Sequence, residues 1–130
     1  MLRKVLDELL AANRAKGSQL VLVYLPTPAD WKGSASDGWR RFVRREARQR
    51  GLPLLDLVAE LRRLPAREVE PLFIRPGVLE YVGAAGHLTP KGNAWVAERL
   101  HATLAAQPSI AARLGAPGAE GEAEATGTAR

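Results

Sequence analysis

Apolar residues in the first quarter of the chain change from helical spacing to a continuous run. Leucine or valine at positions 2, 5, 6, 9 and 10 repeats at i, i+3 and i+4, which predicts an amphipathic helix that ends near Lys16 and Gly17. Residues 20–25 then form an uninterrupted apolar run that contains two valines. A run of this kind is typical of a parallel strand that helices cover on both faces.

The same order of helix and strand is expected in the next segment. Arginines interleave with apolar residues from Trp39 to Arg50, which predicts a helix with one buried and one solvated face, ended by Gly51. Residues 52–55 predict a second short strand. Asp56 follows directly, where its carboxylate can cap a helix that carries apolar residues up to position 64.

The last third of the chain contains one clear helix start. Residues 71–74 predict a third, shorter extended segment, and residues 75–86 form a glycine-containing loop without periodicity. Thr89 is well placed to cap the helix that follows, because Pro90 stands at its first position, where a missing N–H is tolerated.

Helices and strands that alternate along a chain predict an α/β fold with right-handed crossovers and a parallel sheet. We expect one domain over residues 1–107, followed by a short helix and a disordered tail over residues 108–130. Only two strands are well predicted, and a buried parallel strand needs a neighbour on each side. The sheet is therefore expected to be short and incomplete, with an open apolar edge.

Composition removes several classes of function. The 130 residues contain no cysteine, which excludes disulfides, thiolate zinc sites and a cysteine nucleophile, and the two histidines stand fourteen residues apart and predict no metal site. We predict no cofactor. No apolar run is long enough to cross a bilayer, and Asp7 and Glu8 interrupt the stretch that a signal peptide needs. The chain as written is expected to be soluble and cytoplasmic, and a cell-envelope location would require an export signal upstream of Met1.

A net charge of +5 raises the question of nucleic-acid binding. Six of the fifteen arginines fall on the predicted helix that ends at Arg50, and no set of aromatic side chains accompanies them to stack on bases. We interpret these arginines as a solvated helix face and expect no nucleic-acid partner. Binding that falls steeply with salt would support the opposite interpretation.

The most specific pattern lies near the end of the chain. Residues 86–100, GHLTPKGNAWVAERL, place His87 just before a capped helix that carries Gly92, Asn93 and an Ala-Glu pair. Together with the strand that ends in Pro-Thr and the strand Leu-Leu-Asp-Leu at 54–57, this run resembles the carboxyl-terminal half of the SGNH, or GDSL, hydrolases, over about residues 1–104. The resemblance implies a partial, flavodoxin-like three-layer α/β/α fold. It also implies an esterase, lipase or carbohydrate acetyl-ester activity, with His87 as the general base that activates a serine.

Two departures from the family concern catalysis directly. The family nucleophile belongs to a Gly-Asp-Ser block near the start of the domain, and no serine of this chain matches it. The oxyanion-hole blocks are absent as well. The family usually has an aspartate three residues before the histidine, and this chain has Ala84. The four serines are Ser18, Ser34, Ser36 and Ser109.

These departures leave two interpretations. In the first, the chain is a fragment of an ester hydrolase that is inactive alone and requires a missing amino-terminal half. In the second, it is a non-catalytic module that keeps the hydrolase shape and associates with a partner, or with a second copy of itself, through the open sheet edge. The ester substrate is not predicted, no substrate contact is assigned to Arg75 or Tyr81, and Asn93 is interpreted as a helix-surface residue.

Overall fold

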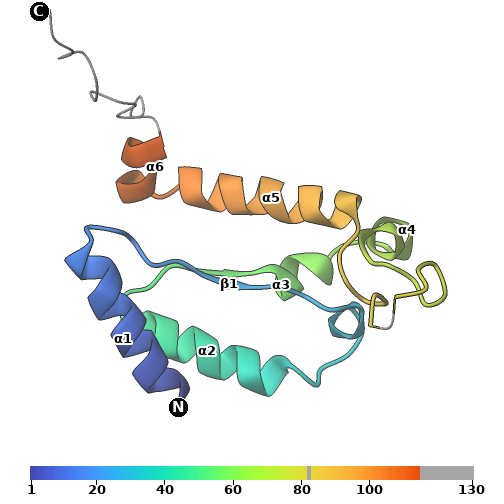
Figure 1. The fold of residues 1–130 in the computed structure, drawn as a ribbon, viewed down its shortest axis with the longest axis horizontal. Helices are drawn as coiled ribbons and strands as arrows, with labels where there is room; N and C mark the ends of the chain where they lie inside the picture. The colour runs from blue at the N-terminus through green and yellow to red at the C-terminus, as the bar shows by residue number, and fades with distance from the viewer. Residues whose placement is uncertain (82, 115–130) are drawn as a thin grey trace, which may run out of the picture.

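The computed structural model describes residues 1–81 and 83–114 (Figure 1). Within these residues the sheet has two parallel strands, β1 (Leu22–Tyr24) and β2 (Leu54–Asp56), with Val23 opposite Leu55. The predicted parallel pairing is therefore confirmed, although each strand is shorter than its apolar run. The helices and 3-10 turns are α1 (Leu2–Ala15), η1 (Pro28–Asp30), α2 (Asp37–Gln49), α3 (Leu57–Leu61), α4 (Ala66–Val69), η2 (Glu70–Leu72), α5 (Pro90–Ala105) and α6 (Pro108–Leu114).

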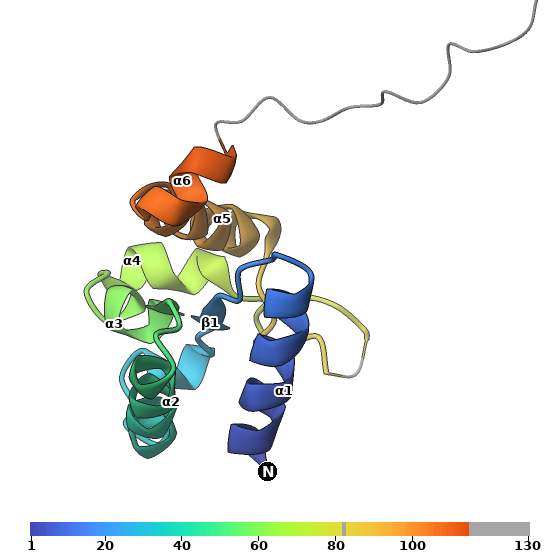
Figure 2. The ribbon, with the colours of Figure 1, turned by 90° about the vertical axis from the view of Figure 1, so that its left-hand side faces the viewer.

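The helices lie on both sides of the strands. In Figure 1 and in the perpendicular view of Figure 2, α5 lies above β1, whereas α1 and α2 lie below it. This mixture of helices and parallel strands agrees with the predicted α/β class. The short helix expected after residue 107 is α6, and the predicted tail from Gly115 lies outside the described residues. No helix in the described ranges is long and apolar enough to span a bilayer.

The hydrophobic core lies between β2, α3 and α5. Leu57, Val58 and Leu61 are completely buried, because three of the five residues of α3 face inward. Each fully buried leucine contributes about 1.5–3 kcal/mol to folding. The buried members of the main cluster are Leu55, Leu57, Leu61, Val69, Leu72, Phe73 and Trp95.

The third extended segment predicted at residues 71–74 does not join the sheet. Its first part continues the 3-10 turn η2, and Phe73 forms an isolated antiparallel bridge with Leu88. The physical reason is that Pro71 has no N–H for a strand ladder and that the carbonyls of Pro71 and Leu72 accept hydrogen bonds from Thr89. The segment therefore holds the start of α5 in place.

The arginine-rich helix α2 is not solvated along its whole polar face. Asp56 caps α3 as predicted, since its Oδ1 accepts from the Val58 N–H at 3.3 Å. The same carboxylate also accepts hydrogen bonds from the guanidinium groups of Arg40 and Arg44, each at 2.8 Å. Arg40 is only 6% exposed, so the prediction of a solvated arginine is wrong at this position. The Asp56 side chain is only 10% exposed at the end of β2, so its charge requires a counter-charge, and α2 supplies it.

A fully buried carboxylate, that of Glu46, attaches α1 to α2. Glu46 is fully buried and accepts hydrogen bonds from Arg50 at 2.9 Å and from Arg3 of α1 at 3.1 Å. Arg50 also pairs with Asp7 of α1 at 2.8 Å. Burial raises the pKa of Glu46, but the hydrogen bonds from Arg50 and Arg3 outweigh it and hold this pKa below its ordinary value.

The lowered pKa predicts acid sensitivity. A carboxyl whose pKa is lower in the folded than in the unfolded state stabilises the fold above its ordinary pKa of about 4.3 and loses this effect as the pH falls further. We expect the urea midpoint of the parent to fall between pH 6 and pH 3, and Glu46→Gln to show a smaller fall. Glu8→Gln is the control, because the Glu8 side chain is 66% exposed on α1. An identical pH dependence in all three proteins would contradict this role of Glu46.

Candidate functional site

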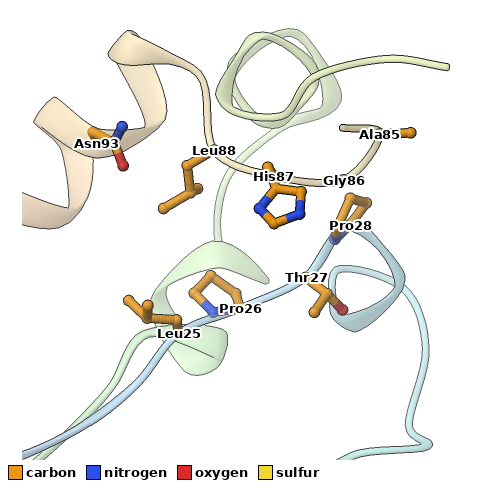
Figure 3. A pocket seen from close by; sticks show the side chains of 9 residues that line it. All are labelled: Leu25, Pro26, Thr27, Pro28, Ala85, Gly86, His87, Leu88 and Asn93. Carbon is orange, nitrogen blue, oxygen red and sulfur yellow. The ribbon is translucent and has the colours of Figure 1, made fainter. Parts of the chain in front are cut away.

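An open cleft of about 680 Å³ lies at the carboxyl end of β1 (Figure 3). One wall is the segment that continues β1, the opposite wall is the loop before α5, and Asn93 lies on the first turn of that helix. The imidazole of His87 projects from the loop toward the β1 side (Figure 3), and its side chain is exposed. The lining residues are Leu25, Pro26, Thr27, Pro28, Ala85, Gly86, His87, Leu88 and Asn93.

Backbone hydrogen bonds fix the loop that carries His87. The Ile74 N–H donates to the His87 carbonyl at 2.8 Å, and the Gly86 N–H donates to the Ile74 carbonyl at 2.8 Å. Gly86 has a φ of +85°, and a Cβ at this position would lie 3.6 Å from the ring of Pro28. That distance is an ordinary van der Waals contact, so glycine is needed here for the left-handed turn.

The first turn of α5 fixes the other side of the loop. The Thr89 hydroxyl accepts from the Gly92 N–H at 3.1 Å and donates to the Pro71 carbonyl at 2.7 Å, which confirms the predicted cap. The Thr89 N–H donates to the Leu72 carbonyl at 2.9 Å. A Cβ on Gly92 would lie 2.2 Å from the same carbonyl oxygen, so only glycine allows this approach. Thr89 and Gly92 are therefore positioning residues for His87.

The opposite wall is held by a buried aspartate. Asp30 is 7% exposed, and its Oδ2 accepts hydrogen bonds from both the N–H and the hydroxyl of Thr27 at 2.8 Å, while Ser36 donates to Oδ1. Burial raises the pKa of Asp30, but these hydrogen bonds outweigh it and keep this pKa below its ordinary value. The Asp30 carboxylate therefore serves to hold the turn after β1.

The cleft contains an imidazole but no matching nucleophile among its lining residues. Thr27 is the one hydroxyl side chain among the described lining residues, and its proton is donated to Asp30. Ser36 is also bonded to Asp30, and none of the lining residues is a serine or a carboxylate. Ala84 is 5% exposed, and its carbonyl accepts from the His87 N–H at 3.2 Å, but its methyl group offers no acceptor to the imidazole.

Sequence reasoning did not assign Asn93 to the site. This residue is exposed on α5, as expected of a helix-surface residue, but its side chain also lines the His87 cleft. Asn93 stands four residues after the cap Thr89, on the first turn of α5. This short distance from the cap is the sequence signal that could have placed Asn93 near His87. Arg75 and Tyr81 do not line this cleft. Comparisons with protein-family models, curated proteins and solved structures give no match for this chain.

The close approach of Gly92 predicts a specific stability defect. Gly92→Ala places a methyl group against the Leu72 carbonyl and should destabilise the fold by about 1–3 kcal/mol, measured by urea unfolding. Gly38→Ala is the control, because Gly38 also lies in the first turn of a helix but its Cβ would have no neighbour closer than 4.0 Å. That variant should be neutral or more stable by about 0.5–1 kcal/mol. Equal effects at the two positions would contradict the tight contact between Gly92 and the Leu72 carbonyl.

Proposed function

We propose that this chain is the histidine-bearing part of an SGNH-type ester hydrolase, with His87 as its general base. The observation that carries the proposal is the position of the exposed imidazole in a cleft at the carboxyl end of a parallel strand. Ligands of open α/β sheets bind at this edge. The residues 86–93 that resemble the family's last motif block are also the ones that position the imidazole.

The proposed chemistry is acyl transfer. A serine hydroxyl attacks the ester carbonyl while His87 takes its proton, and the imidazolium then gives that proton to the departing alkoxide. A water molecule repeats the sequence on the acyl-enzyme and releases the acid. Because the described cleft residues include no serine, the nucleophile and the oxyanion donors have to come from a further polypeptide segment that faces His87.

Among the described residues, β1 pairs with β2 only, and its other edge offers a place for this segment. The Leu22 N–H donates to the Pro53 carbonyl at 2.9 Å. Because successive residues of a strand direct their backbone groups to opposite sides, the N–H and carbonyl of Val23 point away from β2. Val23 and Leu25 are 38% and 52% exposed, although apolar parallel strands are normally covered. A further strand along this edge would complete an α/β/α unit in which α5 covers one face and α1 and α2 cover the other.

The same edge favours a second candidate function. A module without catalysis would use β1 to bind a partner strand, either from another protein or from a second copy of this chain. The two candidates differ in the role of His87, which is essential in the first and dispensable in the second.

The isolated chain should not show His87-dependent hydrolysis of p-nitrophenyl acetate. His87→Ala and His101→Ala are matched variants, because both histidines are exposed and exposed imidazoles give a similar small background rate. We expect equal rates for the two variants. A lower hydrolysis rate in His87→Ala alone would show that the nucleophile lies within these 130 residues. It would contradict the proposal that a further segment supplies the nucleophile.

The coding sequence upstream of Met1 separates the two candidates. A hydrolase fragment predicts an in-frame Gly-Asp-Ser block within about 60–100 codons, the length that completes a domain of ordinary size. If that stretch holds no such block, the fragment hypothesis loses its basis and the binding module is favoured.

The binding module makes its own prediction about association. The 14.1-kDa chain should sediment as a stable oligomer, and Val23→Lys should convert it to a monomer because a charge on an edge strand opposes pairing. Val78→Lys is the control, since Val78 is 60% exposed in the loop before His87. A parent chain that sediments as a monomer and melts cooperatively would contradict association through this edge.

A further inference from the structure

A second cavity, of about 390 Å³, lies directly behind the loop that carries His87. It shares Pro28, Ala85 and Gly86 with the His87 cleft. In Figure 3 the side chain of Ala85 points away from the imidazole. The deeper walls of this cavity are formed by Trp31, Val69 and Phe73.

The apolar walls of this cavity are held in fixed positions. The Trp31 indole N–H donates to the Leu64 carbonyl at 3.1 Å, and the Lys32 ammonium lies 4.4 Å from the centre of the indole ring. Val69 and Phe73 are 3% and 6% exposed and belong to the hydrophobic core. A cavity with such walls keeps its shape when it is empty, which lowers the entropy that a ligand loses on binding.

The cavity is also coupled to His87 through one residue. Ile74 lines the cavity, and its N–H and carbonyl bond to His87 and Gly86, both at 2.8 Å. A ligand group that fills the cavity therefore contacts the loop that carries His87, at Ala85 and Gly86. The volume falls within the range of about 300–1,000 Å³ that small-molecule sites occupy.

We propose that this cavity binds the acyl group of a carboxylic ester whose chain is longer than acetyl, in contact with the loop that carries His87. The proposal rests on the proposed function for the identity of the reacting group, and the cavity itself determines the preference for an apolar chain. An acetyl group leaves most of the cavity unfilled, whereas a hexanoyl chain moves four further carbons out of water.

Methyl hexanoate is the probe, with methyl acetate for comparison, and binding is measured by amide and indole NMR shifts of the full chain. The three indole N–H signals are assigned with single Trp→Phe variants. We expect saturable shifts at Trp31 and Gly86, no shift at the exposed Trp39, and binding of methyl hexanoate at least tenfold tighter than that of methyl acetate. Equal affinities, or shifts spread over all three indoles, would overturn the proposal.

Ala85→Leu fills the shared wall and should weaken methyl hexanoate binding at least tenfold. Ala35→Leu is the matched control, because Ala35 is exposed in the loop before α2 and lines neither space. Binding that Ala85→Leu leaves intact would overturn the proposal. The parent chain could also fail to bind the ester while Ala85→Leu changes the oligomeric mass. That result would identify a second copy of the chain as the occupant of the cavity and would also overturn the proposal.

His87→Ala separates this inference from the proposed function. The cavity does not include the imidazole, so this variant should bind methyl hexanoate as the parent does. If methyl hexanoate binds but His87 has no catalytic role, the cavity remains a site for apolar acyl groups and only the hydrolase proposal fails. Hydrolysis that depends on His87 without preferential binding of the longer ester would support the hydrolase and overturn the acyl cavity.

Discussion

The geometry around His87 depends on one close contact, between the first turn of α5 and the backbone of Pro71 and Leu72. Thr89 bonds to both carbonyls, and Gly92 lies so near the Leu72 oxygen that a methyl group would collide with it. This contact determines where α5 begins and therefore where the loop before it crosses the end of β1. The imidazole reaches the cleft because the loop is attached at this end and at Ile74.

Three carboxylates with little solvent exposure hold other elements of the fold together. Asp30 closes the turn after β1, Asp56 connects β2 and α3 to α2, and Glu46 connects α2 to α1. Each is surrounded by hydrogen-bond donors, as burial of a charge requires. They explain why a chain with so many arginines does not present all of them to solvent, since two of these three carboxylates are paired with guanidinium groups.

The features that sequence predicted correctly are local ones. Thr89 and Pro90 begin α5, and Asp56 caps α3, because a cap needs only the residues that follow it. The burial of Arg40 was not predictable in this way, since its partner stands sixteen residues away and meets it only in the folded chain. The bridge between Phe73 and Leu88 and the contribution of Trp31 to a cavity beside His87 likewise depend on tertiary packing. For the site itself, sequence identified His87 and its motif, but it did not place Asn93 in the cleft or reveal the second cavity.

The central claim is that His87 activates a serine supplied by another segment. The most direct measurement is fluorophosphonate labelling, read by peptide mass spectrometry, of a polypeptide that includes this chain together with the Gly-Asp-Ser block that the proposal expects upstream of it. The account predicts that the probe modifies the serine of that block and that His87→Ala abolishes the modification, while His101→Ala does not. Labelling of Ser18 or Ser34, or labelling of the block that is indifferent to His87, would contradict it.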